Sequence, residues 1–96
     1  MEQLSQLLKS KRESKGLLLR EVASEIEVDT ALVSKIENSD RRPTKEQLKK
    51  LSKTLEIDFN KLLIMWYVEK IYEEIKDEKN LKEIVKELNK VIRKEK

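Results

Sequence analysis

The sequence predicts an all-α protein, and two features of its composition lead to this fold class. Only one glycine and one proline occur among the 96 residues, so few positions break a helix. Leucine, lysine, glutamate and isoleucine dominate the rest, and the apolar residues recur three and four positions apart, as on one face of a helix. A chain of this length forms one small domain, which gains stability when a second subunit covers part of its surface.

Three short helices are predicted in the N-terminal part of the chain. The first ends at Gly16, and the second runs from about residue 19 to residue 26. Asp29 is a suitable N-cap for the third, which ends near Asn38 in a polar loop. The residues expected to be buried by these helices are Leu4, Leu7, Leu8, Val22, Ala23, Ile26, Val33 and Ile36.

Three further helices are predicted in the C-terminal part. Thr44 and Gln47, after Pro43, have the spacing of a capping box and begin the fourth helix. Asp58 caps a fifth helix, whose early part is apolar on nearly all sides and therefore needs two surfaces to cover it. A charged segment around residues 77–80 precedes a sixth helix, which is strongly amphipathic.

The second and third predicted helices are short and joined by a tight turn, which is the arrangement of a helix-turn-helix. The third helix presents small and polar residues from its first turns, and a helix of this kind fits the major groove of DNA. We therefore divide the chain into a helix-turn-helix DNA-binding domain, residues 1–60, and C-terminal helices, residues 61–96. We expect the C-terminal helices to pack on the first region and to mediate dimerisation.

The composition disfavours several other classes of protein. Cysteine and histidine are absent, so the usual transition-metal ligands are missing, and we expect no metal site and no cofactor. The carboxylates are dispersed over solvated helix faces, so we expect no enzyme. The net charge of +3 fits nucleic-acid binding without requiring it. The longest apolar run, residues 62–68, is too short to cross a bilayer, and we expect a cytoplasmic protein without membrane contact.

Several motifs occur at fixed spacings between residues 8 and 57. They are Gly16-Leu17, Val22-Ala23, Val28, the run VSKIEN from Val33 to Asn38, and Pro43-Thr44. In this register the segment resembles the Cro/phage-repressor-like helix-turn-helix family of transcriptional regulators, also called XRE. The resemblance implies a five-helix repressor-like DNA-binding bundle, here with an extended fifth helix and an additional C-terminal helix.

The resemblance also implies roles for individual residues, which would otherwise pass for ordinary solvated surface positions. The residues expected to contact base edges are Thr30, Ala31, Ser34 and Lys35, with Leu32 close to the groove wall or a thymine methyl group. Those expected to contact the DNA backbone are Asn38, Arg41, Arg42 and Lys45, although Asn38 is also a candidate helix cap. In the family, an arginine near the end of the first helix pairs with a glutamate at the end of the recognition helix. These positions fall on Arg12 and Glu37.

The sequence departs from the family pattern at two places. Leu18 and Leu19 stand where the family usually has Thr-Gln, so the phosphate contact of that glutamine is missing or replaced. Glu27 stands where the turn usually has glycine, and a left-handed conformation costs a non-glycine residue about 1 kcal/mol.

A single recognition helix contacts few base pairs, so specific binding usually needs two copies with recognition helices ~34 Å apart on a palindrome. The residues expected at a two-fold interface are Leu63, Trp66, Tyr67, Ile71, Ile84 and Leu88, with some of Leu81, Val85 and Val91, and several of them are shared with the core. A stacking platform for single-stranded nucleic acid is the less favoured interpretation, because aromatic residues at helical spacing within an apolar run are usually core or interface.

The favoured hypothesis is a sequence-specific double-stranded DNA-binding transcriptional regulator that acts as a homodimer on a palindromic operator. More distantly, the run from Leu17 to Leu48 is similar to the controller proteins of restriction-modification genes, which implies a repressor or activator of such genes. The alternative is an antitoxin-like or adaptor-like interaction module whose C-terminal helices hold a partner protein. A degenerate helix-turn-helix used only for dimer architecture is a third hypothesis.

Overall fold

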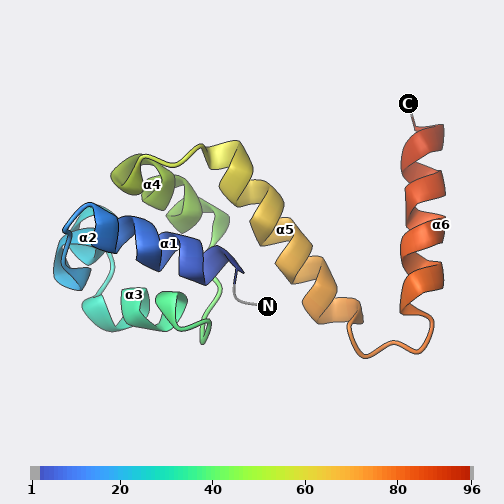
Figure 1. Cartoon of the computed structure of the whole chain (residues 1–96), viewed down its shortest axis with the longest axis horizontal. Coiled ribbons are helices and arrows are strands. Elements are labelled where there is room, and N and C mark those ends of the chain that lie inside the picture. The colour runs from blue at the N-terminus through green and yellow to red at the C-terminus, as the bar shows by residue number, and fades with distance from the viewer. Residues whose placement is uncertain (1–2, 96) are drawn as a thin grey trace.

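The computed structural model describes residues 3–95, and this part of the chain contains six α-helices and no strand. Their bounds are α1, Gln3–Ser14; α2, Leu19–Glu25; α3, Thr30–Glu37; α4, Lys45–Leu55; α5, Phe59–Ile75; and α6, Leu81–Lys94. The all-α prediction is confirmed. Figure 1 shows α1 to α4 gathered at one end of the molecule, α5 leading away from them, and α6 standing apart. Within the described range, none of the helices is long and apolar enough to cross a membrane.

Side-chain caps fix the starts of three helices, because the first turn of a helix leaves backbone N–H groups without partners. The carboxylate of Asp29 accepts a hydrogen bond of 2.8 Å from the amide of Leu32, and so begins α3. Thr44 and Gln47 form the predicted capping box, with bonds of 3.1 and 3.0 Å. Asp58 accepts from the third residue of α5 at 3.2 Å.

A residue with positive φ follows each of the first four helices. These residues are Gly16, Glu27, Ser39 and Glu56, with φ between 56° and 67°. A left-handed residue at this position ends a helix and turns the chain toward the next one. Only Gly16 adopts this conformation without steric cost, so the other three turns each carry about 1 kcal/mol of strain that tertiary contacts must offset.

One hydrophobic core joins α1 to α5. Its largest fully buried side chains are Leu8, Ile26, Leu48, Leu55, Leu62, Val22 and Val33. Burying each such side chain contributes about 1.5–3 kcal/mol, so this cluster is the main source of stability for the N-terminal bundle.

α5 and α6 relate differently to this core. α5 lies against α4 and α1 and buries Leu62 and Trp66, whereas α6 buries none of its residues. The sequence led us to expect both C-terminal helices to pack on the N-terminal region, and α6 departs from that expectation. The segment 76–80 carries α6 away from the bundle (Figure 1), and within residues 3–95 the apolar side chains of α6 are not buried against the core.

Candidate nucleic-acid interface

The sequence of α3 divides this helix into an inner and an outer face. Val33 and Ile36, three positions apart, are 1% and 3% exposed and attach the helix to the core. The opposite side begins at the N-terminal turn and is open to solvent. Of the five residues expected at the DNA groove, the exposed ones are Thr30, Ala31 and Lys35, and the half-buried ones are Leu32 and Ser34.

The turn between α2 and α3 sets the direction of the outer face. Ile26 is buried and anchors the turn, and the left-handed Glu27 reverses the chain with φ of 62°. The amide of Val28 then donates to the carbonyl of Ala23 at 3.0 Å, which closes the turn. Glu27 therefore adopts the conformation expected for the glycine that it replaces.

Arg12 and Glu37 hold α3 to α1. The Arg12 Nε donates to Glu37 Oε2 at 2.7 Å, and Nη2 donates to Oε1 at 3.1 Å, which makes the pair bidentate. A third guanidinium nitrogen donates to the carbonyl of Leu17 at 2.8 Å, so the α1–α2 loop is fixed as well. The side chains are only 13% and 7% exposed. The hydrogen bond to Glu37 raises the pKa of Arg12 above its ordinary value, although burial opposes this shift.

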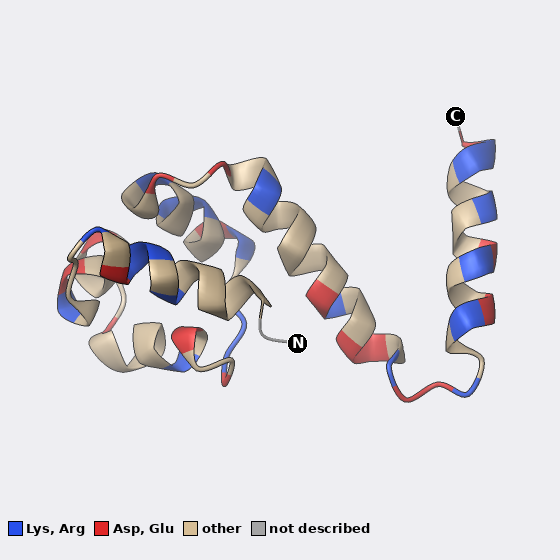
Figure 2. Cartoon of the chain, viewed as in Figure 1, with Lys and Arg blue, Asp and Glu red and all other residues tan. Residues whose placement is uncertain are grey.

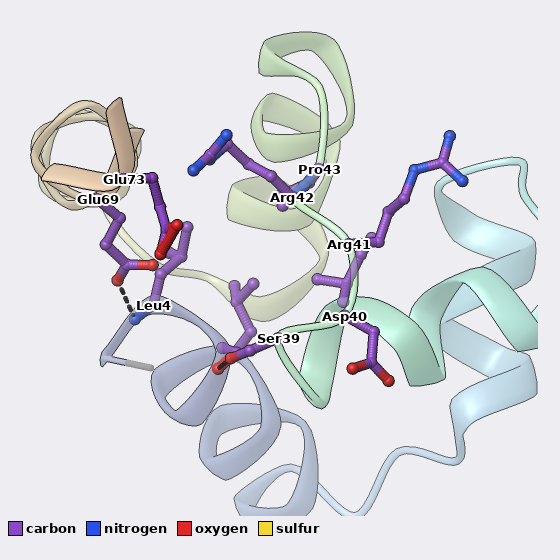
Figure 3. A pocket seen from close by; sticks show the side chains of 11 residues that line it. Leu4, Ser39, Asp40, Arg41, Arg42, Pro43, Glu69 and Glu73 are labelled. Carbon is purple, nitrogen blue, oxygen red and sulfur yellow. Dashed lines mark hydrogen bonds between the residues drawn. The ribbon is translucent and has the colours of Figure 1, made fainter. Parts of the chain in front are cut away.

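The loop that follows α3 carries two of the expected backbone-contacting residues. It is held at both ends, because the hydroxyls of Ser5 and Ser39 share a hydrogen bond of 2.6 Å and the indole N–H of Trp66 donates to the carbonyl of Pro43 at 2.7 Å. Between these contacts, Arg41 and Arg42 are exposed. Figure 3 shows their side chains on opposite sides of the loop, with Arg42 on the side of α5.

The other two expected backbone-contacting residues lie at helix ends. Asn38 is exposed and follows the last residue of α3, where its backbone N–H donates to the carbonyl of Ser34 at 3.0 Å. Lys45 is the first residue of α4, and its Nζ lies 4.9 Å from the centroid of the Tyr67 ring. This cation–π contact brings an expected DNA contact and an expected dimer residue together.

The start of α2 shows what replaces the Thr-Gln of the family pattern. Leu19 packs against the core, while Leu18 is 48% exposed. The Glu21 carboxylate accepts from the amide of Leu18 at 2.8 Å. Sequence reasoning missed this role of Glu21, since its usual signal is a Ser or Thr three positions earlier. A carboxylate at this helix N-terminus disfavours a phosphate at the same place.

A surface cleft of about 320 Å³ lies between the N-terminal end of α1, the loop after α3, and α5. Figure 3 shows Arg42 extending from the loop toward α5, which carries Glu69 and Glu73 on the other side of the cleft, and it shows the bond of 2.8 Å from the Leu4 amide to Glu69. The Glu73 pKa is lowered mainly by its hydrogen bond to Lys76, with a smaller contribution from Arg42. Among residues 3–95, no cluster of three or more carboxylates could hold a metal ion.

The residues expected at the dimer interface differ in their exposure to solvent. Trp66 lies in the core, and Leu63 is partly buried against it. Tyr67, Ile71, Ile84 and Leu88 are exposed. Sequence reasoning missed two exposed neighbours on α5, Ile64 and Val68, although their spacing of four placed them on one face.

The comparison with protein families agrees with this geometry. Comparison with curated proteins and with solved structures gave no match. Residues 8–62 match the model of the family HTH_3, described as helix-turn-helix. The matched segment contains α2, α3 and α4 in full, together with most of α1 and the first residues of α5. The chain belongs to this helix-turn-helix family of the Cro and phage-repressor type, whose members are DNA-binding regulators.

Proposed function

We propose that the protein is a sequence-specific double-stranded DNA-binding transcriptional regulator that acts as a homodimer on a palindromic operator. The observation that carries this proposal is the outer face of α3, which is open to solvent from its first turn while Val33 and Ile36 hold the helix to the core. A rigid, half-exposed helix of this kind supplies base readers at fixed positions.

Base readout is assigned to the outward side chains of α3. Lys35 donates to the O6 and N7 atoms of a guanine, and the hydroxyls of Thr30 and Ser34 bond to either kind of base edge. Ala31 contacts a thymine methyl group. Each good contact contributes ~1–3 kcal/mol of discrimination between bases. Leu32 is half-buried and packs against the core, which supports a place at the groove wall rather than over a base.

Backbone contact is assigned to the residues around the loop after α3. Arg41 and Arg42 are exposed cations on a loop fixed at both ends, and Lys45 is an exposed cation at the start of α4. Asn38 lies between the loop and the recognition helix. These contacts are independent of sequence and set the salt dependence of binding.

The test is selection from a randomised duplex pool by the purified protein, with sequencing of the bound fraction and determination of its mass in solution. Enrichment of a palindrome with half-sites about one helical turn apart, by a dimer, is the expected result. A well-folded protein that enriches no sequence would overturn the assignment of α3 as a base reader.

We also infer, from the resemblance to controller proteins, that the genes under control belong to a restriction-modification system. A controller binds near its own promoter and tunes expression of the methyltransferase or endonuclease, and the position of the operator decides between repression and activation. The expected result is that the selected palindrome recurs upstream of such genes. An operator found only beside unrelated genes would remove this part of the proposal.

A second candidate function is an interaction module of the antitoxin or adaptor kind. The apolar side chains that α5 and α6 leave exposed favour it, because large exposed patches mark interaction sites. The two candidates differ in what covers these side chains. A purified protein that stays monomeric, exposes this surface to a hydrophobic dye and enriches no DNA sequence would favour the interaction module.

A further inference from the structure

The exposed apolar residues of the described chain are concentrated on two helices. Of eleven large hydrophobic residues classed as exposed in residues 3–95, ten lie on α5 or α6. They are Ile64, Tyr67, Val68, Ile71 and Tyr72 on α5, and Ile84, Val85, Leu88, Val91 and Ile92 on α6. Scattered exposed apolar residues are ordinary, whereas two continuous sets on neighbouring helices indicate an interface.

The two helices carry apolar stripes with the same spacing. The α5 stripe consists of Ile64, Tyr67, Val68, Ile71 and Ile75, and the α6 stripe of Leu81, Ile84, Val85, Leu88 and Ile92. In each stripe the successive intervals are three, one, three and four residues. This spacing places each set on one helix face, about 16 Å long at 1.5 Å per residue. The stripes are thus matched in length and in the spacing of their side chains, so each could cover the other along its whole length.

Within one chain these stripes do not cover each other. α5 packs against α1 and α4, and Figure 1 shows α6 rising away from α5 after the connecting segment. A helix of 14 residues is marginal in water without a packing partner. The α6 helix therefore needs a surface that residues 3–95 of its own chain do not supply in this arrangement.

The net charges of α5 and α6 favour pairing of α5 with α6 over pairing of α6 with α6. α5 carries two lysines and three glutamates, whereas α6 carries five basic and two acidic residues. Figure 2 shows the acidic residues of α5 near its C-terminal end and the basic residues distributed along α6. An α5–α6 pair brings opposite net charges together, whereas an α6–α6 pair brings two positive helices together.

We propose that the occupant of both stripes is a second copy of this chain, in which α6 of each copy packs on α5 of the other. The exchange is isologous: each copy gives one helix and receives one, so a two-fold axis relates two identical α5–α6 contacts. This proposal rests on the homodimer of the proposed function and specifies its contact. It also explains why a helix with a continuous apolar face stands away from its own core.

The chain has no cysteine, so single introduced cysteines report on the contact without background. Val68→Cys and Val85→Cys place thiols at corresponding positions of the two stripes, where the native side chains are 50% and 51% exposed. The two variants, one with an added tag that changes its mass, are unfolded, refolded together and treated with a short bis-maleimide. The expected product is a cross-linked dimer of intermediate mass, containing one chain of each kind.

The matched control uses Lys86→Cys in place of Val85→Cys. Lys86 is also exposed but lies on the polar side of α6. With the Val68→Cys partner, this variant is expected to give several-fold less cross-linked dimer. A similar yield from both α6 positions would overturn the proposal, because the cross-link would then report collision rather than packing.

The double variant Val68→Cys/Val85→Cys separates exchange from closure within one chain. Exchange predicts a cross-linked dimer, and a cross-linked monomer at low protein concentration would overturn the proposal in favour of a closed α5–α6 hairpin. Cross-links that join only two copies of Val68→Cys, or a monomeric mass in solution, would overturn it as well.

Selection from the duplex pool keeps this inference distinct from the proposed function. If a dimer enriches a palindrome while only α5–α5 cross-links form, the regulator stands and the exchange fails. If the α5–α6 cross-link forms but no sequence is enriched, the exchange stands and the base-reading assignment fails.

Discussion

The indole N–H of Trp66 donates a buried hydrogen bond of 2.7 Å to the backbone carbonyl of Pro43, and so joins α5 to the loop that carries Arg41 and Arg42. The two residues lie 23 positions apart in sequence. Trp66 is 7% exposed, so the carbonyl has little access to water as a substitute partner. The position of the arginine loop therefore depends on the helix that carries one of the two apolar stripes.

The substitution Trp66→Phe is expected to lower the free energy of unfolding by about 2–4 kcal/mol, because it removes buried volume and leaves the Pro43 carbonyl without its hydrogen-bond donor. Chemical denaturation measures the change. Tyr72→Phe is the matched control on the exposed side of the same helix, and a change below about 0.5 kcal/mol is expected there. Equal effects of the two substitutions would contradict the assignment of Trp66 as the anchor of the loop.

The pair formed by Arg12 and Glu37 is expected to be strongly coupled. Either Arg12→Met or Glu37→Gln should lower the free energy of unfolding by about 2–3 kcal/mol, because each leaves a largely buried partner without its bidentate contact. A double-mutant cycle by urea denaturation should give a coupling energy of about 1 kcal/mol or more. Additive effects would show that the pair is not a unit.

The pH dependence of this pair follows from the raised pKa of Arg12. The pKa of Arg12 is higher in the folded protein than in the unfolded chain. Such a cation contributes its full stabilisation at any pH below the pKa of the unfolded chain, and this contribution is lost only as the pH rises through the pKa of the folded protein. For arginine both values lie far above neutrality. Arg12→Met should therefore lower the free energy of unfolding by the same amount at pH 6 and at pH 9. A smaller loss at pH 9 than at pH 6 would contradict a charged Arg12 as the source of stability.

Glu27→Gly is expected to stabilise the protein by up to about 1 kcal/mol, since glycine adopts φ of 62° without the strain that a side chain brings there. The ion pair with Lys50 that would be lost has a distance of 3.4 Å and is exposed, so its contribution is small. Glu25→Gly, at the end of α2 where φ is helical, should destabilise by about 0.5–1 kcal/mol. Thermal unfolding of the two variants gives opposite shifts if the left-handed turn is the cause.

The fold was largely predictable because its signals are local. The acceptors that begin α3 and α4, Asp29 and Thr44, lie within three residues of the amides that they cap, and the apolar spacing fixes the inner face of each helix. The arginine and glutamate positions came from the family register rather than from periodicity, since these residues lie 25 positions apart.

The contacts that sequence reasoning missed are those that depend on three-dimensional position. Nothing near Trp66 in sequence indicates that its N–H reaches Pro43, and nothing in Lys45 indicates that its ammonium group lies over Tyr67. The placement of α6 was missed for a related reason. Periodicity shows that a helix has an apolar face, but it does not show whether that face meets its own chain or another.

The assignment of base readers and backbone contacts on the DNA surface is tested by comparing Lys35→Ala with Arg42→Ala. Lys35 is an exposed residue of α3, so its loss is expected to relax base preference at particular operator positions, at a cost of ~1–3 kcal/mol for the preferred base. Arg42 lies on the loop, so its loss should weaken binding to all duplexes and reduce the slope of log affinity against log salt by about one.

The control is Lys53→Ala, which replaces an exposed lysine near the end of α4 and should change neither base preference nor salt dependence. Binding isotherms on the selected operator, on single-base variants and at several salt concentrations measure all three. If Lys35→Ala weakens every sequence equally, Lys35 contacts the backbone and the assignment of base readout to this position is wrong.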